Sequence, residues 1–170
     1  PVSFWRSVGN SYNGFFHETF LDELAHKSGI DPVEMRLKLM AKWPAAIKVV
    51  EEAARMSGWG QPQQQGRGRG FAFTLSFGTW VAQVIQVSVE GEAIRVEKAW
   101  CAADVGTALD PRIIESQMQS GIIFGLSAAT GQEITFEEGQ VQQSNFSDYD
   151  AMRINQTPEI EVAILQNSPW

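Results

Sequence analysis

Apolar residues in the first part of the chain recur every three or four positions, which is the spacing of one helical face. Between residues 13 and 28 this spacing predicts a helix, and Gly29 supplies its end. The repeat is carried by Phe15, Phe16, Phe20, Leu24 and Ala25. We therefore expect the first element of the fold to be a helix.

Two further helices are predicted by their start signals. Asp31 can accept hydrogen bonds from the free amides of a first helical turn, and Pro32 fits the first helical position. This second helix should run to Met40. A third helix should follow Pro44 and end at Gly58, where glycine again supplies the stop.

Beyond residue 70 the apolar spacing changes to strict alternation, the pattern of a half-buried strand. A first alternating run covers residues 71–77 and a second covers residues 81–89, and a third strand is expected over residues 94–103. Short turns such as Glu90-Gly91-Glu92 join these runs, so we expect three consecutive strands in an antiparallel meander.

A long helix rich in small residues is predicted after the meander. Asp110-Pro111 again places a capping residue before a first-turn proline, and the helix should run from Arg112 to about Thr130. Glycine inside a helix costs up to ~1 kcal/mol relative to alanine, so we expect another backbone or a ligand to approach this helix closely. Its small residues are Ser120, Gly121, Gly125, Ser127, Ala128 and Ala129.

Short strands at residues 133–136 and 159–165, separated by a polar loop around residues 144–155, complete the predicted elements. The sequence therefore predicts an α+β fold. We expect a mostly antiparallel sheet, made of the three-stranded meander plus short strands, with the helices packed on one side.

A chain of this length fits a single domain over residues 1–170. We expect a helical part over residues 1–60, a flexible connector over residues 61–70, and a strand-rich part with the glycine-rich helix over residues 71–170. The connector contains Gly66-Arg67-Gly68-Arg69-Gly70, which could also indicate RNA or phosphate binding. It matches neither the dinucleotide fingerprint nor the P-loop, so the connector is the interpretation we favour.

Composition narrows the classes of function. The 13 Lys and Arg residues are outnumbered by 20 Asp and Glu, giving a formal charge of −7. Binding of a phosphate backbone needs a surplus of Lys and Arg, so we do not expect nucleic acid as a partner. No apolar run approaches the ~20 residues that a membrane span requires.

The single cysteine, Cys101, limits the redox chemistry of the chain. One thiol excludes an internal disulfide, and it excludes an iron–sulfur cluster ligated within this chain because such clusters need about four thiolates. Cys101 lies in an apolar stretch, so we expect a buried and unreactive thiol.

One spacing raises the question of a metal site. Glu18, Asp22 and His26 fall four residues apart on the first predicted helix and could offer three ligands to a metal. His17-Glu18 is not followed by a second histidine four residues on, so the zinc protease motif is absent. We favour a solvated polar helix face and predict no metal ligand in this chain.

Two positions could bind an anion or a polar ligand. Arg6 lies beside Gly9, just before a helix whose first amides point outward, an arrangement that suits an anion or an oxo ligand. The alternative is a loop arginine paired with a carboxylate. Gln117, near the start of the glycine-rich helix, can donate and accept hydrogen bonds at once, as a pterin edge requires. Its alternative is a solvent-facing glutamine.

Several segments, in their order and spacing, together resemble the molybdopterin-binding large subunit of the molybdenum hydroxylases (the xanthine dehydrogenase and aldehyde oxidase type). Within that family they are similar to the isoquinoline 1-oxidoreductase beta-subunit group. The segments are residues 4–9 (FWRSVG), 16–25 (FHETFLDELA), 29–32 (GIDP) with Arg36, 77–83 (FGTWVAQ), 103–106 (ADVG), Asp110-Pro111, and 121–126 (GIIFGL) with Gln117.

The resemblance implies roles for individual positions. Arg6 would lie by the molybdenum centre, with the backbone of residues 7–9 near it, and Gln117 would contact the pterin dinucleotide. The implied cofactor-binding residues are Arg6, Ser7, Gly9, Gln117 and Gly121.

Two further positions depart from the family's pattern. Val8 would line the substrate pocket where relatives often have an aromatic residue, which implies a differently shaped substrate. Ser120 stands where a glycine is usual.

For the complete subunit, the resemblance implies hydroxylation of an aldehyde or an N-heteroaromatic compound with oxygen from water. The cofactor would be molybdopterin, as the cytosine dinucleotide, with molybdenum. The partners would be a small [2Fe-2S] subunit or domain and the remainder of the large subunit, in the cytoplasm or periplasm of a bacterium. The family's general base is a glutamate in a Gly-x-Gly-Glu motif, which does not occur here. We therefore expect no catalytic residue in this chain, and an inactive isolated fragment.

Other classes of function remain open at this point. The chain could be a non-catalytic binding or scaffold domain that keeps the fold without the chemistry, or an RNA-binding module that uses the Arg-Gly stretch. A fragment with exposed apolar surface could also pair with a second copy of itself.

Overall fold

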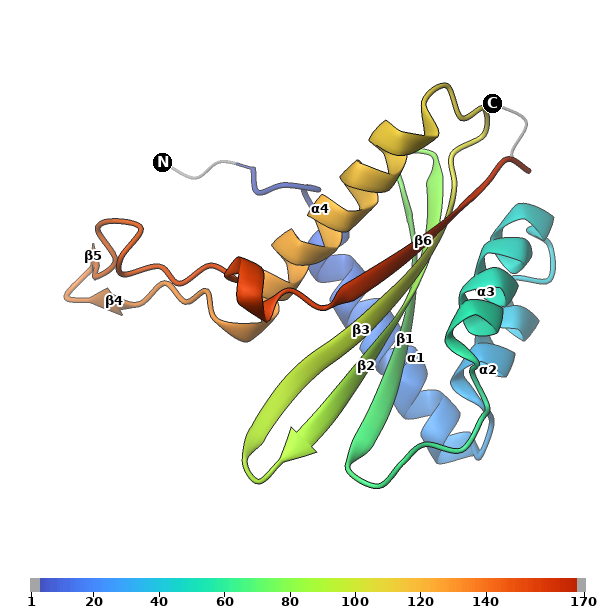
Figure 1. Cartoon of the computed structure of the whole chain (residues 1–170), viewed down its shortest axis with the longest axis horizontal. Helices are drawn as coiled ribbons and strands as arrows, with labels where there is room; N and C mark the ends of the chain where they lie inside the picture. The colour runs from blue at the N-terminus through green and yellow to red at the C-terminus, as the bar shows by residue number, and fades with distance from the viewer. Residues whose placement is uncertain (1–3, 168–170) are drawn as a thin grey trace.

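The computed structural model describes residues 4–167, and its elements follow the predicted order closely (Figure 1). The helical first part is followed by the strand meander, a long helix and a last strand. The elements are α1 (Asn10–Ser28), α2 (Pro32–Leu39), α3 (Pro44–Ser57), β1 (Arg67–Ser76), β2 (Thr79–Glu90), β3 (Ala93–Asp104), α4 (Pro111–Thr130), β4 (Phe136–Glu137), β5 (Gln140–Val141), the 3-10 turn η1 (Ile154–Gln156) and β6 (Glu159–Leu165).

The helix boundaries follow from the capping residues. Asp31 Oδ1 accepts hydrogen bonds from the amides of Val33 and Glu34 at 2.8 and 3.1 Å, and Asp110 caps α4 in the same way. Helices α1 and α3 end where Gly29 and Gly58 take left-handed φ angles of 65° and 61°. These φ angles strain any residue with a Cβ, so the predicted glycine stops are confirmed.

The sheet is mostly antiparallel, with the strand order β1-β2-β3-β6. The pairs β1–β2 and β2–β3 form the predicted meander. The fourth strand, β6, pairs with β3 in parallel, from Lys98 opposite Glu159 to Asp104 opposite Leu165. A parallel pair needs a long crossover, and here α4 and the segment after it supply one. The α+β fold class is thereby confirmed.

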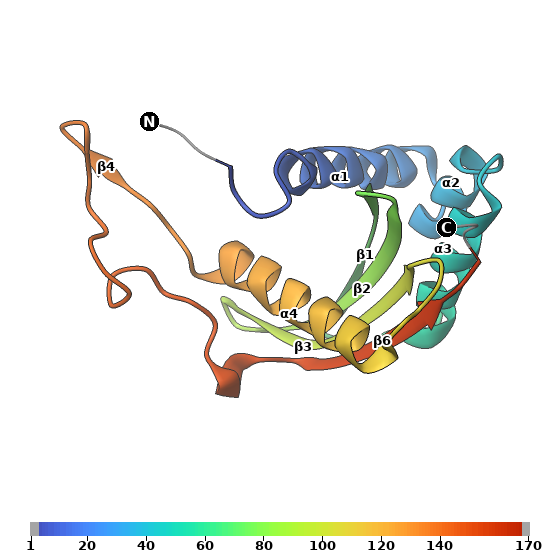
Figure 2. The same cartoon turned by 90° about the horizontal axis from the view of Figure 1, so that it is seen from above.

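The helices cover both faces of the sheet, which corrects the expectation that they pack on one side. Alternate residues of β3 point to opposite faces. Trp100 and Ala102 pack against α2 and α3, whereas Ala99 and Cys101 pack against Ile122 of α4. Figure 2 shows α4 and α3 on opposite sides of the sheet. Because helices cover both faces of β3, its last six residues are all buried.

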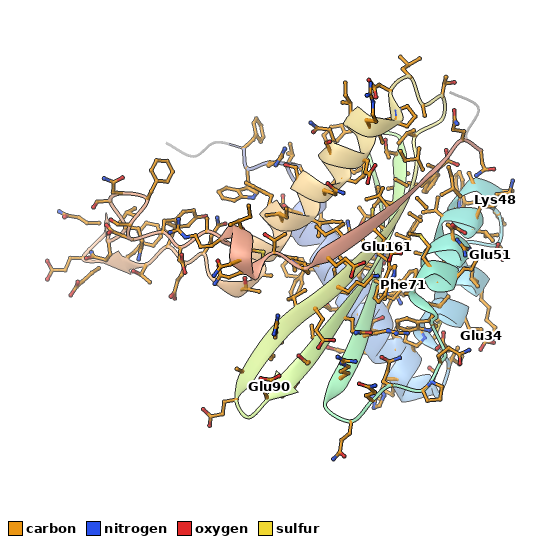
Figure 3. All side chains as sticks on the ribbon, viewed as in Figure 1. Glu34, Lys48, Glu51, Phe71, Glu90 and Glu161 are labelled. Atoms are coloured by element: carbon orange, nitrogen blue, oxygen red, sulfur yellow. The ribbon has the colours of Figure 1, made fainter. Side chains whose placement is uncertain are left out.

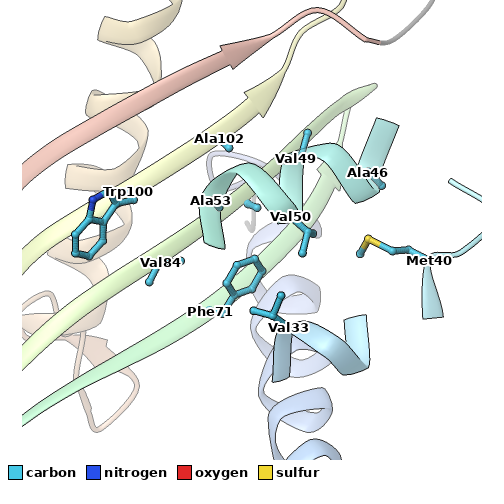
Figure 4. Close-up of a cluster of buried hydrophobic side chains, with 11 residues drawn as sticks. Val33, Met40, Ala46, Val49, Val50, Ala53, Phe71, Val84, Trp100 and Ala102 are labelled. Atoms are coloured by element: carbon cyan, nitrogen blue, oxygen red, sulfur yellow. The ribbon is translucent and has the colours of Figure 1, made fainter. Parts of the chain in front are cut away.

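The larger core lies between the sheet and α2–α3 (Figure 4). Val49, Val50 and Ala53 of α3 are fully buried in it, and Phe71 of β1 fills the space beside them. Its buried members are Val33, Met40, Ala46, Val49, Val50, Ala53, Phe71, Ala82, Val84, Trp100 and Ala102. The opposite face of α3 is polar, and Figure 3 shows Lys48 and Glu51 on its outer side.

The predicted connector is shorter than expected. Strand β1 begins at Arg67, so residues 67–70 belong to the sheet and only residues 61–66 lie outside regular structure. Arg69 is fixed by three contacts: to Gln86 Oε1 at 3.0 Å, to the Gly58 carbonyl at 2.9 Å, and over the Trp100 ring at 5.4 Å. These contacts explain why an Arg-Gly stretch forms a strand here.

The predicted strand at residues 133–136 is replaced by a small hairpin. Strands β4 and β5 contain two residues each and pair only with one another. They lie in the long segment between α4 and β6, which extends away from the sheet (Figures 1 and 2). Among residues 4–167, no helix combines the length and the apolar content that crossing a membrane demands.

Cys101 is buried in the smaller core, as expected, and its burial has a pH consequence. Desolvation raises the pKa of the thiol from 9.0 to about 12. The unfolded chain releases this proton above pH 9, whereas the folded chain holds it until pH 12 is approached. The free energy of unfolding should therefore fall over that interval, by at most about 1.4 kcal/mol per pH unit.

Urea titrations at neutral pH and at about pH 10 should detect this loss, and Cys101→Ala should reduce it. A thiol reagent should label Cys101 only in urea. Labelling of the native chain at the rate of the unfolded chain would contradict the assignment.

Candidate functional site

Arg6 lies in the turn that precedes α1 and rests on α4. Its guanidinium carbon is 4.9 Å from the centre of the Phe124 ring, and the neighbouring Trp5 ring is 5.6 Å from the same ring. In the part of the chain that the structure describes, Arg6 forms no ion pair or side-chain hydrogen bond. The alternative of a loop arginine paired with a carboxylate is therefore not observed.

Gln117 lies on the same exposed face of α4 as this contact. Phe124 follows Gln117 by seven residues, so the two share one helix face about 10 Å apart along the axis. Gln117 and Gly121 are both exposed. The Gln117 amide has no hydrogen-bond partner among residues 4–167, whereas the nearby Gln119 is bonded to Glu115. Arg6 and Gln117 thus lie on one side of the molecule.

The backbone between Arg6 and α1 has an unusual conformation. Ser7 and Val8 have φ angles of 68° and 53°, and left-handed φ values are uncommon for residues other than glycine and unfavourable for a β-branched side chain. Hydrogen bonds from Val8 N to the Trp5 carbonyl and from Asn10 N to the Ser7 carbonyl, both 3.0 Å, hold the turn.

The start of α1 leaves amide groups available. Its N-cap is Gly9, which has no side chain to cap the helix, and its first turn contains no acidic residue. Within residues 4–167, the amides of Ser7 and Gly9 donate to no backbone carbonyl. A helix start of this kind favours negative charge. It suits a ligand with anionic oxygens.

The glycine-rich face of α4 is not covered by the described part of the chain. A Cβ built on Gly121 or Gly125 would meet no atom within 4 Å among residues 4–167. The expected close neighbour of these glycines is thus not an element of residues 4–167, and that expectation stays a prediction.

Glu18 and Arg36 form a buried polar cluster, which corrects the expectation of a solvated helix face. Arg36 is 1% exposed and Glu18 is 5% exposed. Glu18 Oε2 accepts hydrogen bonds from Arg36 Nε at 2.8 Å and from the amide of Phe73 at 2.7 Å. Arg36 is also ion-paired with Asp22 at 2.8 Å. His26 is exposed and takes no part.

This cluster joins α1 to α2 and to the outer edge of β1. The Phe73 amide belongs to an edge strand and would otherwise lack a partner on that side. The apolar burial of α1 is small, since Leu21 and Ala25 are its buried apolar residues. The aromatic repeat that predicted α1 faces away from the cluster, and Phe16 and Phe20 are 62% and 57% exposed. Polar contacts therefore contribute much of what positions α1.

The chemistry available to this part of the chain is binding and orientation. Among residues 4–167, no group of three or more His, Cys, Asp or Glu side chains is arranged to hold a metal ion. One cavity of about 590 Å³ lies between the start of β3, the end of α4 and residues 150–159. It contains neither Arg6 nor Gln117.

Sequence reasoning missed Phe124 and the role of Arg36. Phe124 lies within a segment that stands out in the sequence only for its small residues, although its spacing of seven from Gln117 places it on the same helix face. In the sequence, Arg36 is noticeable only because it accompanies residues 29–32 (GIDP) in the resemblance to the molybdenum hydroxylases. Its partner is 18 residues away on another helix, a contact that no local pattern announces.

Comparison with known proteins identifies a family. The family described as "Molybdopterin cofactor-binding domain" matches residues 17–158. The chain is 34% identical over 170 residues to the beta subunit of isoquinoline 1-oxidoreductase from Brevundimonas diminuta, covering 97% of this chain and 22% of that protein. It is 32% identical over 184 residues to a nicotinate dehydrogenase subunit from Pseudomonas putida, covering 96% of this chain and 15% of that protein.

Among solved structures, quinoline 2-oxidoreductase from Pseudomonas putida 86 matches with a TM-score of 0.47 and 25% identity, over 54% of this chain and 12% of that one. The chain thus spans less than a quarter of the length of each of the two relatives above. The turn that contains Arg6 precedes the residues of the family match, but it lies within the alignment to the isoquinoline enzyme, which covers nearly the whole chain. The match over residues 17–158, together with this similarity, shows that the chain belongs to the molybdopterin cofactor-binding domain family of the molybdenum hydroxylases.

Proposed function

We propose that this chain supplies one wall of the molybdenum cofactor site in a larger hydroxylase subunit. The observation that carries the proposal is the position of Arg6, a cation without a carboxylate partner among residues 4–167, on the helix face that also presents Gln117. Family membership supports the proposal, because the family is described by its binding of the molybdopterin cofactor.

The residues on this face fit such a group. The cofactor carries phosphate and oxo oxygens, for which the Arg6 guanidinium and the free amides of Ser7 and Gly9 are suitable donors. The Gln117 amide can donate to and accept from a pterin edge. Gly121, which has no Cβ, leaves room for a flat group against α4. Arg6, Ser7, Gly9, Gln117 and Gly121 are therefore the proposed cofactor-binding residues.

When bound, the cofactor would supply a two-electron oxidation that takes its oxygen from water. This chain would orient the cofactor and stabilise negative charge on it through Arg6. Gln117 would fix how the cofactor is turned relative to α4. Val8 would line the substrate side, where valine offers no aromatic surface for stacking. The substrate class we propose is an aldehyde or an N-heteroaromatic compound.

The remaining assignments are proposed on the same basis. The cofactor would be the cytosine dinucleotide form of molybdopterin, and electrons would leave through a [2Fe-2S] subunit or domain. The names of the two relatives describe oxidoreductase subunits, which supports a partner chain. Release of cytidine monophosphate from the purified intact enzyme on acid hydrolysis would test the dinucleotide.

The proposal predicts loss of cofactor when its ligands are removed. Arg6→Ala and Gln117→Ala in the intact subunit should each lower molybdenum retention or turnover by about 10- to 100-fold, as removal of supporting groups at metal sites does. Molybdenum per subunit is measured by mass spectrometry of the metal. The matched controls are Arg55→Ala and Gln119→Ala, which remove an exposed arginine and a glutamine bonded within α4.

Unchanged molybdenum content and turnover in both variants would overturn the proposed roles of Arg6 and Gln117. If the intact wild-type subunit retains molybdenum yet oxidises no aldehyde or heteroaromatic compound, the scaffold alternative is correct and the enzymatic part of the proposal is wrong.

A further inference from the structure

Phe124 joins the Trp5–Arg6 turn to α4 through one cation–π contact and one contact between aromatic rings. The Arg6 guanidinium carbon lies 4.9 Å from its ring centre, and the Trp5 ring lies 5.6 Å away at an interplanar angle of 35°. Both distances are within the range of a favourable cation–π or aromatic contact. The backbone hydrogen bonds of the turn, in contrast, lie within residues 5–13.

This turn needs an external support. Ser7 and Val8 hold successive left-handed φ angles, and such conformations persist only where the surroundings determine them. Internal hydrogen bonds give the turn its shape, but none of them connects it to α4. Helix α1 is joined to β1 at Asn10, whose side-chain amide donates to Ser76 Oγ at 2.9 Å, and further along the chain at Glu18, but neither contact holds the turn against α4. Without the Phe124 contacts, the Trp5–Arg6 turn would be joined to the sheet only through α1.

We propose that Phe124 is a positioning residue, which holds Arg6 on the helix face that presents Gln117. This inference rests on the proposed function. It names the residue that joins the turn containing Arg6 to the face of α4 that presents Gln117. An aromatic face attracts a guanidinium without using its N–H groups as hydrogen-bond donors. Arg6 is thereby held in place with all its donors available to an anionic ligand.

Phe124 contacts two different groups, the Trp5 ring and the Arg6 guanidinium, and substitutions at position 124 can separate the two contacts. A leucine at position 124 keeps apolar contact with Trp5 but provides no π face for the Arg6 cation. A tyrosine keeps the face. If the cation–π contact matters, Phe124→Tyr should behave as the wild type, whereas Phe124→Leu should behave as Phe124→Ala.

The position of the turn can be measured without reference to the cofactor. Trypsin cleaves after arginine, so the Arg6–Ser7 bond reports how often the turn leaves α4. In the intact subunit prepared without cofactor, Phe124→Ala should speed cleavage at this bond about tenfold, because cleavage tracks the population of the open form. Cleavage after Lys27, which lies at the far end of α1, should not change. Phe146→Ala, which removes an exposed ring elsewhere, is the matched control.

Molybdenum retention and the melting temperature are then measured on the same variants. We expect Phe124→Ala to lose cofactor without a comparable fall in melting temperature, and Phe124→Tyr to restore it. Unchanged cleavage at Arg6–Ser7 in Phe124→Ala would overturn the inference, whatever happens to the cofactor. Wild-type behaviour of Phe124→Leu would overturn the cation–π assignment. Faster cleavage with unchanged molybdenum would support the contact and contradict the proposed function instead.

Discussion

Replacing Arg36 with methionine is expected to lower the free energy of unfolding by about 3–5 kcal/mol, the cost of leaving buried charges without their partner. Arg36 is 1% exposed and contacts Glu18 and Asp22. Methionine fills similar volume, so the loss would come from the stranded carboxylate of Glu18 rather than from a cavity. Urea denaturation followed by circular dichroism measures the change.

Two further variants make this result interpretable. Arg55→Met removes an exposed arginine that pairs with Glu52 three residues away, and it should cost less than about 1 kcal/mol. Adding Glu18→Gln to Arg36→Met removes the stranded charge and should recover part of the loss. A stability of Arg36→Met within about 1 kcal/mol of wild type would show that the cluster does not hold α1.

The second large effect is expected at Asp104, at the end of β3. Its carboxylate is fully buried and accepts hydrogen bonds from the amides of Gly106 and Asn167, both at 3.0 Å. It thus ties the turn after β3 to the chain that leaves β6. Asp104→Ala should lower the free energy of unfolding by about 2–4 kcal/mol, because amides in a buried region lose their acceptor.

Asp110 provides the control for this variant. It also accepts hydrogen bonds from two backbone amides, those of Arg112 and Ile113, but it does so at an exposed helix start. Asp110→Ala should therefore cost only about 1 kcal/mol. Equal losses in the two variants would mean that burial at Asp104 adds nothing to the strength of its contacts.

The local elements of this fold could be predicted because their signals are local. Asp31 and Asp110 cap the helices that they were expected to begin, and Gly29 and Gly58 end theirs. The alternation of apolar residues predicted the three strands of the meander. Each of these features depends on a few neighbouring residues, so sequence alone contains the necessary information.

The arrangement of the helices depended on contacts that sequence spacing does not encode. One signal was nevertheless present: residues 99–103 (AWCAA) form an unbroken apolar run, which is the mark of a strand covered on both faces. The prediction of helices on one side did not take this run into account. The parallel addition of β6 had no local sign, because it is determined by the path of the whole crossover.

In the candidate site, too, some residues could be predicted from local sequence and others depend on distant contacts. Arg6 and Gln117 could be selected as residue types, because a cation beside a helix start and an amide on a small-residue helix suit an anionic, hydrogen-bonding ligand. The burial of Glu18 and the contacts of Phe124 were not predicted, because both depend on residues that are distant in sequence. The environment of Glu18 is made by Arg36 and Phe73, and the partners of Phe124 lie more than a hundred residues away in sequence.

The parallel pairing of β6 with β3 has a consequence for synthesis on the ribosome. Residues 105–158 must be made before β6 emerges, although its partner strand is already complete. In that interval the nascent meander can pack against α3, while the backbone edge of β3 lacks its partner strand. Unpaired strand edges recruit other chains. Between translation of residue 104 and residue 165, the edge of β3 is therefore open to pairing with another chain.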